Sequence, residues 1–222
     1  MIAVVVPVYG NAATLEALAA RLDDALADRV WGLRFVIDAS PDDSAAVAHR
    51  LAAADARIAV TDLTDNVGQH RALAAGLAAE PEADAWVCLD ADLQDPPEAV
   101  PLLLDRLDRG DVEAVFAGRR GAYESVGRRL TGSLHRRVAA RLTGLPADAG
   151  AFLAMRSTVR SAVLDAMAEG APSVVLAVGR SGRPVTSVPV ARDRRRVGTS
   201  AWTAQARLRQ SLGSLSWALR RR

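Results

Sequence analysis

Hydrophobic runs alternate with amphipathic segments through the first half of the chain. Five runs have the length and composition of buried strands: residues 2–8, 33–37, 58–63, 85–89 and 112–117. The segments between them space apolar residues as helices do, and these helices are expected to end near residues 28, 54, 79 and 109. This alternation predicts an α/β fold with a mostly parallel central sheet and helices on both faces. Ligands of such sheets bind outside the carboxyl ends of the strands.

Polar residues mark where the expected helices begin. Thr14 is expected to cap the first helix. The turn over residues 38–44 leads into the second, with an Asx turn and helix capping by Asp42 or Ser44. Pro97 is well placed to start the helix after the fourth strand, and Asp95 is a candidate cap for it.

The pattern changes after residue 117. Apolar residues recur every four positions over residues 126–142, which predicts an amphipathic helix with several Arg residues on its other faces. Residues 151–155 and 185–190 are expected to be short strands, with a helix over 157–169 between them. Residues 202–219 form a second Arg-bearing amphipathic segment.

Charge is unevenly distributed, although the net charge of the 222 residues is only +2. Every basic residue is Arg, and Arg gathers after residue 119 and at the C-terminus. A basic second half suggests an anionic partner such as phosphate or a lipid headgroup. Nucleic acid fits poorly, because only 4% of the residues are aromatic and few bases could stack.

Cys88 is the single cysteine and lies in an apolar run, so a buried and inert thiol is expected. The chain shows no signal peptide, and no apolar run reaches the length of a membrane-spanning helix. We therefore expect a cytoplasmic protein that can lie on the inner face of a membrane without crossing it.

Two carboxylates, Asp90 and Asp92, follow the fourth strand. Paired acids at the end of a buried strand repel each other and lose hydration, which a divalent cation bridging to a diphosphate would offset. Mg²⁺ and Mn²⁺ favour such oxygen ligands. Taken alone, the pair also fits a solvated loop at a helix start; its position on the predicted sheet favours the metal.

Two further loops end at the same edge of the predicted sheet. Asp38 can accept a hydrogen bond from a base N–H or a ribose hydroxyl, or it can form an Asx turn. Gly68 permits close backbone approach at a helix start, which favours an anion. The first strand lacks the Gly-x-Gly-x-x-Gly turn of dinucleotide-binding folds, and the absence of Lys excludes a phosphate-loop NTPase.

Taken together, four segments resemble the family 2 glycosyltransferases of the GT-A fold, and most closely the branch that transfers sugars to dolichyl and polyprenyl phosphates. The segments are VVPVY at 5–9, DASPD at 38–42, NVGQH at 66–70 and LDADLQDPPE at 89–98. Weaker similarity continues at residues 124–129 and 148–150 and at Arg192, Gly198 and Ser200. The sequence departs from the family pattern at Ile37, where an acid is usual, and at Ala201, where Lys is usual.

The resemblance implies a single domain over residues 1–222, with a nucleotide-sugar-binding half (1–117) and an acceptor-binding half with an amphipathic tail (118–222). It implies a UDP- or GDP-linked sugar donor and a Mg²⁺ or Mn²⁺ ion held by Asp92 and Gln94. The expected donor-binding residues are Pro7, Tyr9, Asp38, Ser40, Gly68, Gln69, Asp90, Ala91 and Asp92. The expected acceptor-binding residues are Arg119, Arg120, Arg128, Arg192 and Ser200.

The expected reaction is an in-line displacement that inverts the anomeric carbon, with Asp90 and Asp92 as catalytic residues. A polyprenyl phosphate acceptor is already largely ionised, since its second pKa is about 6, and it needs Arg positioning rather than a base. A soluble hydroxyl acceptor would need a carboxylate base, for which Asp148 is the candidate. A non-catalytic nucleotide-sugar-binding subunit is the third alternative, and a membrane surface or membrane protein is a further expected partner.

Overall fold

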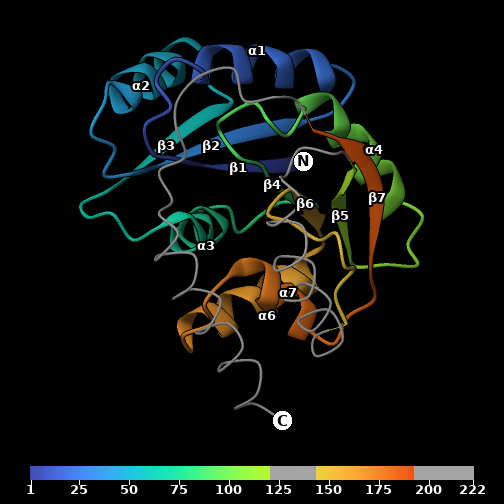
Figure 1. The fold of residues 1–222 in the computed structure, drawn as a ribbon. Coiled ribbons are helices and arrows are strands. Elements are labelled where there is room, and N and C mark those ends of the chain that lie inside the picture. Colours follow the sequence, from blue (N-terminus) through green and yellow to red (C-terminus); the bar gives the residue numbers. More distant parts are fainter. Residues whose placement is uncertain (121–143, 193–222) are drawn as a thin grey trace, which may run out of the picture.

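The computed structural model describes residues 1–120 and 144–192, apart from the side chains at positions 119 and 120. Within these residues, seven strands form one sheet in the order β3-β2-β1-β4-β6-β5-β7 (Figure 1). The strands are β1 (Ile2–Val8), β2 (Trp31–Asp38), β3 (Ile58–Leu63), β4 (Ala85–Cys88), β5 (Ala114–Arg120), β6 (Leu153–Met155) and β7 (Val185–Ala191). The division of the chain at residue 117 stays a prediction.

The sheet is mostly parallel, as predicted. Neighbouring strands from β3 to β4 pair in parallel, and so do β5 and β7. Strand β6 is antiparallel to both β4 and β5, with Leu153 opposite Cys88 and Phe116. Residues that precede β6 in the chain therefore lie beyond the carboxyl ends of β4 and β5. The antiparallel strand brings a late segment of the chain to the same edge as the early loops.

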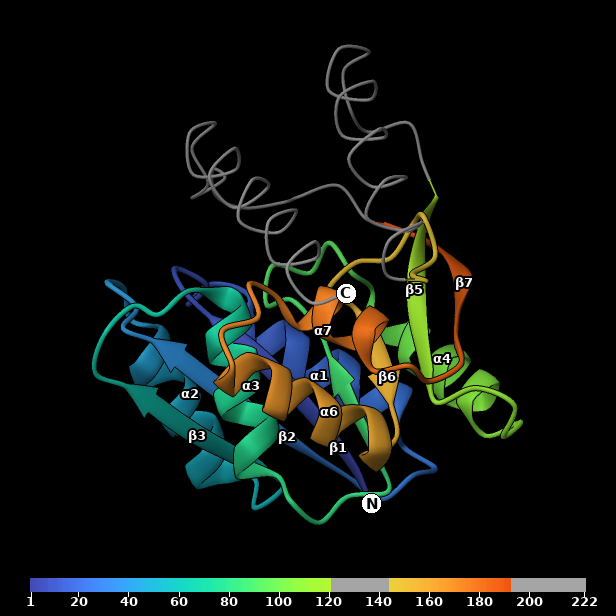
Figure 2. The same cartoon turned by 90° about the horizontal axis from the view of Figure 1, so that it is seen from below.

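Helices cover both faces of the sheet (Figures 1 and 2). The described elements are α1 (Leu15–Ala25), α2 (Ser44–Ala54), α3 (Gln69–Ala79), the 3₁₀ turn η1 (Pro97–Ala99), α4 (Val100–Leu107), α6 (Ser157–Ala168) and α7 (Val174–Arg180). The apolar residues of α1 and α4 pack in one core, and those of α3, α6 and α7 pack in the other. Strand β1 alternates between them, because Val4 and Val6 face the first core while Ala3 and Val5 face the second. A strand buried on both faces explains the uninterrupted apolar run at the start of the sequence.

The helix starts differ from the expected ones in their hydrogen bonds. Thr14 stands at the N-cap of α1, as predicted, but its hydroxyl makes no capping bond; it lies within hydrogen-bonding distance of the carbonyls of Asn11 (2.9 Å) and Ala91 (2.7 Å) instead. Asp95 does not cap a helix either, because Pro96 precedes η1 and the Asp95 carboxylate binds Arg192. An Asx-type bond forms at Asp42, whose Oδ1 accepts the N–H of Ser44 at 3.1 Å, but the N-cap of α2 is Asp43 and makes no side-chain capping bond, so neither Asp42 nor Ser44 caps α2.

Several bounds also differ from those expected. Helix α1 ends at Ala25, three residues early, because the chain turns there toward β2. The strand expected over residues 151–155 is shorter, because β6 covers only Leu153–Met155. Helix α7 was not predicted. The amphipathic segments expected over residues 126–142 and 202–219 lie outside the described residues.

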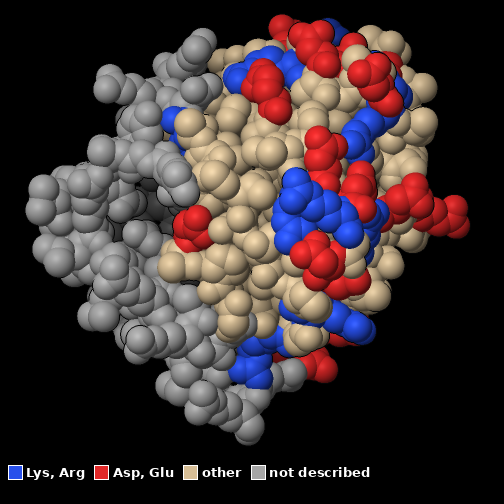
Figure 3. All heavy atoms as spheres, turned by 90° about the vertical axis from the view of Figure 1, so that its right-hand side faces the viewer, with Lys and Arg blue, Asp and Glu red and all other residues tan. Residues whose placement is uncertain are grey.

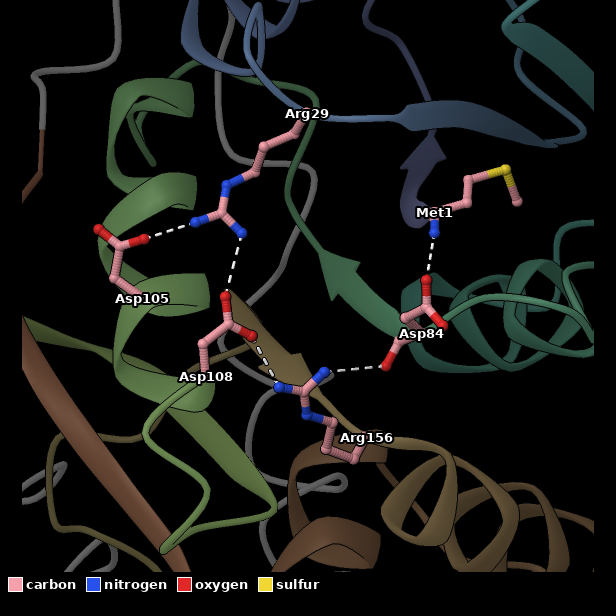
Figure 4. Close-up of polar contacts among 6 residues, drawn as sticks. All are labelled: Met1, Arg29, Asp84, Asp105, Asp108 and Arg156. Carbon is pink, nitrogen blue, oxygen red and sulfur yellow. Dashed lines mark hydrogen bonds and ion pairs between the residues drawn. The ribbon is translucent and has the colours of Figure 1, made fainter.

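A chain of ion pairs lies at the amino edge of the sheet (Figure 4). The N-terminal ammonium binds the carboxylate of Asp84 just before β4, and Arg156 donates to the Asp84 carbonyl (3.2 Å) and the Asp108 carboxylate (2.7 Å). Arg29 continues the chain to Asp108 (3.1 Å) and Asp105 (2.5 Å). These contacts tie β1, α4 and α6 together on the edge opposite the loops that follow strands β1 to β4.

On the face that carries α4, Asp and Glu side chains lie among Arg side chains (Figure 3). Many Arg residues in this part of the structure are paired with acids, so their charge is balanced locally. None of the described helices is both long and apolar enough to cross a bilayer.

Candidate active site

The loops that follow β1, β2, β3 and β4 meet at the carboxyl edge of the sheet, away from the N-terminus (Figure 2). Hydrogen bonds join the first two loops. The N–H of Gly10 donates to Ser40 Oγ (2.8 Å), and the N–H of Ala12 donates to Asp42 Oδ2 (3.0 Å). Burial opposes ionisation of Asp42, but hydrogen bonds from Ser40, Ser44 and backbone N–H groups outweigh it and lower the pKa of Asp42 to about 2. Asp42 therefore stays ionised and fixes the two loops together.

The next contact joins the loop after β2 to the start of α3. Asp38 is 3% exposed, and its carboxylate accepts the backbone N–H groups of Val67 (2.7 Å) and Gly68 (2.9 Å). Gly68 adopts a φ of 85°, a conformation that side chains rarely tolerate. Asp38 thus holds the turn in which Gly68 presents its backbone just before the first residue of α3. Its predicted role toward a base or ribose would use the remaining lone pairs of the same carboxylate.

The loop after β4 carries the two predicted metal-site acids. Gln69, the first residue of α3, donates from Nε2 to Asp90 Oδ1 at 2.6 Å. The Asp92 carboxylate accepts the N–H of Gln94 at 3.1 Å. Leu93 between them has a φ of 58°, the left-handed region that is unfavourable for a branched side chain. Such strain concentrates at functional sites, where surrounding contacts hold it in place.

Two contacts from distant parts of the chain hold this loop. The carbonyl of Ala91, which is 3% exposed, accepts the hydroxyl of Thr14. Arg192, directly after β7, donates to both carboxylate oxygens of Asp95 at 2.5 and 3.0 Å. Its Nη2 also lies 4.0 Å from Asp90 Oδ2. Arg192 was expected at the acceptor, on a tail segment that closes over the donor. The structure places it against the loop that holds the paired acids, and its acceptor role stays a prediction.

Asp148 lies at the same edge, in the segment that leads into β6. A Cβ atom added to Gly118 on β5 would lie 2.2 Å from Asp148 Oδ2. The carboxylate therefore packs directly on the backbone of β5, in space that only glycine leaves open. Antiparallel β6 accounts for this position, because it returns the chain from the carboxyl edge.

The remaining predicted site residues are distributed as follows. Pro7 is buried within β1, paired with Val36, whereas Tyr9 just beyond it is 43% exposed at the edge. The backbone of Arg119 and Arg120 ends β5. The expected acceptor residues Arg128 and Ser200 lie outside the described residues.

His70 was not expected to matter. Its Nδ1 is buried without a hydrogen-bond partner in the described part of the chain, and burial lowers the pKa of His70 to about 4. The imidazole is therefore neutral near pH 7, one residue after Gln69. No local sequence signal distinguishes it from a surface histidine in the first turn of a helix.

The donor set suits a hard divalent cation that also binds a ligand. Within residues 1–120 and 144–192, no group of three or more His, Cys, Asp or Glu side chains is placed to hold a metal alone. Asp92 and Gln94 offer oxygen atoms two residues apart on one short loop. Mg²⁺ is commonly held by one or two carboxylates together with substrate phosphates, so the residues fit a metal whose coordination a diphosphate completes.

Comparison with known proteins identifies the family. The family model described as Glycosyl transferase family 2 matches residues 3–160. The chain is 30% identical over 208 residues to an undecaprenyl-phosphate 4-deoxy-4-formamido-L-arabinose transferase of Klebsiella pneumoniae, covering 91% of this chain and 62% of that protein. The transferase of the same name from Salmonella paratyphi B is 29% identical over the same shares. The chain thus spans less than two thirds of the length of these relatives.

Solved structures share the fold. A mannosyltransferase from Pyrobaculum calidifontis, in complex with GDP-Man and Mn²⁺, has a TM-score of 0.68 at 18% identity, over 99% of this chain and 64% of its own. Glucosyl-3-phosphoglycerate synthase from Mycobacterium tuberculosis, in complex with Mn²⁺, UDP and phosphoglyceric acid, has a TM-score of 0.71 at 19% identity, over 100% of this chain and 78% of its own. These likenesses confirm the GT-A type of fold expected from the sequence. The family-model match over residues 3–160 shows that this chain belongs to glycosyl transferase family 2.

Proposed function

We propose that this chain transfers a sugar from a UDP- or GDP-linked donor to a polyprenyl phosphate and inverts the anomeric carbon. Family membership and the names of the curated relatives, which are undecaprenyl-phosphate sugar transferases, support this acceptor class. The observation that carries the proposal is the loop with Asp90, Asp92 and Gln94, which joins the start of α3 through the bond from Gln69 to Asp90.

The donor would lie across the loops that follow β1 to β4. Pro7, Tyr9, Asp38 and Ser40 would line its nucleoside end, and Gly68, Gln69 and Ala91 its ribose and diphosphate end. The bonds of Asp38 to the backbone before α3 support this arrangement, because they fix the glycine whose backbone a diphosphate would approach. Asp90, bound by Gln69, would face the ribose and diphosphate.

Asp92 and Gln94 would hold a Mg²⁺ or Mn²⁺ ion, which when bound neutralises the charge of the leaving nucleoside diphosphate. The structural neighbours in complex with Mn²⁺ and GDP-Man or UDP support a divalent ion at such a site. The 3.1 Å bond from the backbone N–H of Gln94 to Asp92 Oδ1 orients the Asp92 carboxylate before any ligand arrives.

The acceptor phosphate would be held by Arg119, Arg120 and Arg128, with Ser200 close by. A phosphate that is already ionised needs no base, and guanidinium groups bind it in bidentate fashion. An acceptor with a long lipid tail requires access to a bilayer, so we propose a protein that works at the inner face of a membrane, with its Arg-rich segments against anionic lipid.

Transfer to a soluble hydroxyl acceptor is the second candidate, and Asp148 favours it. Its carboxylate packs against Gly118 at the carboxyl edge, where a base for an alcohol would be needed. If the acceptor is a phosphate, Asp148 has no proton to take and only a structural role.

One assay separates the two acceptors. The protein is incubated with Mn²⁺, a panel of UDP- and GDP-sugars and either vesicles containing a polyprenyl phosphate or a panel of soluble alcohols. Glycosylated lipid and nucleoside diphosphate are then measured for wild type and Asp148→Asn. We expect lipid product from both proteins at rates within a few-fold. Transfer only to soluble alcohols, lost in Asp148→Asn by about 100-fold or more, would replace the first candidate with the second.

A further inference from the structure

Asp95 carries a nearly buried carboxylate in the loop that holds the paired acids. Its side chain is 4% exposed, and Arg192 binds both of its oxygens at 2.5 and 3.0 Å. The partners lie 97 residues apart, one in the loop after β4 and the other directly after β7. The pair therefore connects the end of the last described strand to the proposed metal loop.

Stability alone is a weak explanation for such a pair. Well-packed apolar side chains in place of a buried ion pair are often equally or more stabilising, because both charges lose their hydration. The geometry offers a better reason. Nη2 of Arg192 also lies 4.0 Å from Asp90 Oδ2, so the guanidinium sits between the two carboxylates.

The pairing with Asp95 does not use all of the N–H donors of the Arg192 guanidinium. A guanidinium has five N–H donors in a fixed plane, and the fork with Asp95 uses one on Nε and one on Nη2. Fixing that plane removes the rotamer freedom of a long side chain before a ligand binds. An Arg held in this way is preorganised for a second anion beside Asp90.

We propose that Asp95 is a positioning residue that holds Arg192 beside Asp90, so that the guanidinium binds the diphosphate of the donor. This inference rests on the proposed function, which places the diphosphate at Asp90. Asp95 acts only through Arg192: it contributes no ligand and no proton. Its loss should weaken binding of the diphosphate and leave binding of the nucleoside unchanged.

A second Arg–carboxylate pair nearby provides a matched control. Arg21 donates to both oxygens of Glu98 at 2.7 and 2.6 Å, three residues after Asp95 in the sequence. This pair is half-exposed, with side-chain exposures of 29% and 54%, and it joins α1 to η1 on the outer surface. Glu98→Gln therefore breaks a pair of the same chemistry without touching Arg192.

The test compares the affinities of a nucleoside diphosphate and of its nucleoside by calorimetry, in the presence of Mn²⁺. Wild type, Asp95→Asn, Arg192→Lys, Arg192→Gln, the double variant Asp95→Asn/Arg192→Gln and Glu98→Gln are measured. We expect Asp95→Asn and Arg192→Lys to weaken the diphosphate about tenfold or more and the nucleoside less than twofold. The double variant should lose no more than Arg192→Gln alone, since both changes remove one interaction.

Melting temperatures measured in parallel separate this role from a structural one. If Asp95→Asn weakens nucleoside and diphosphate equally, or matches Glu98→Gln, the positioning role is wrong while the proposed function stands. If wild type binds no nucleoside diphosphate, the proposed function fails, and this inference fails with it. If Asp95→Asn does not fold, Arg192→Lys, which keeps the positive charge, still tests the inference. A selective loss of diphosphate affinity in Arg192→Lys supports the role of the fixed guanidinium plane. Full diphosphate affinity in Arg192→Lys overturns it.

Discussion

At the scale of single residues, contacts between distant segments hold the candidate site together. The paired acids Asp90 and Asp92 stood out because they follow an apolar run, and both lie at the carboxyl edge of the sheet. The hydrogen-bond partners of the acids at this edge could not be predicted, because these partners come from distant segments of the chain. Asp95 pairs with Arg192 across 97 residues, and Asp38 binds backbone N–H groups that no side-chain pattern reveals.

His70 provides a prediction about pH at this scale. Burial lowers the pKa of His70 to about 4, below the value of about 6.5 for an unfolded histidine. Below pH 6.5 the unfolded state therefore binds a proton that the folded state resists. Stability is full above pH 6.5 and falls as the pH drops toward 4, by at most about 3 kcal/mol.

His70→Gln should remove this slope, which urea unfolding between pH 7 and pH 4 would measure as a flatter stability profile. His49, which is exposed and binds Asp62 at 2.8 Å, supplies the control. We expect His49→Gln, which leaves His70 in place, to keep the part of the slope that His70 supplies. Equal profiles for His70→Gln and wild type would show that His70 is not the titrating group.

At the scale of helices and strands, periodicity predicted every strand and helix of the first half, with ends that differ from the observed ones by up to three residues. Strands β1 and β3 and helices α2 and α3 have the expected bounds, since each contains a clear run between turn residues. Helix α7 was missed because its seven residues are too short to show a period. Ser173, whose side chain accepts the N–H of Leu176 at 3.2 Å, was the available signal for its start. The antiparallel direction of β6 depends on pairing and left no mark in the sequence.

Gly76 tests how closely α3 must approach the sheet. A Cβ at this position would lie 2.4 Å from Cγ1 of Val5 on β1 and 2.7 Å from Cγ2 of Val36 on β2, and both valines are buried. In an exposed helix, Gly→Ala is stabilising by about 1 kcal/mol. Here we expect Gly76→Ala to destabilise by about 1–3 kcal/mol instead, because neither valine has space to move.

Urea unfolding of Gly76→Ala and of Gly76→Ala/Val36→Ala would check this packing. The second change removes the clash with Val36 on β2, so the double variant should lose less stability than the sum of the losses in Gly76→Ala and in Val36→Ala measured alone. A gain in stability for Gly76→Ala alone would mean that α3 does not pack this closely.

At the scale of the whole molecule, the sheet explains why residues from separate segments form one site. Parallel strands place the loops after β1 to β4 at one edge, and β6 and β7 bring Asp148 and Arg192 to it. The class of fold and its site edge were predictable from alternation alone. The strand order in the second half was not, because it depends on long-range pairing of short strands.

The proposed function depends on the loop from Asp90 to Gln94, which we propose binds a divalent ion together with the diphosphate of a nucleotide sugar. Mn²⁺ binding followed by electron paramagnetic resonance, with and without UDP or GDP, tests it directly in wild type, Asp92→Asn and Asp65→Asn. Asp65 is an exposed carboxylate in the loop after β3, so its substitution controls for charge at the same edge. We predict that one nucleoside diphosphate tightens Mn²⁺ binding in wild type and Asp65→Asn, and that Asp92→Asn loses about tenfold or more of that affinity. Mn²⁺ binding that is unaffected by either diphosphate, or that is as tight in Asp92→Asn as in wild type, would contradict the claim.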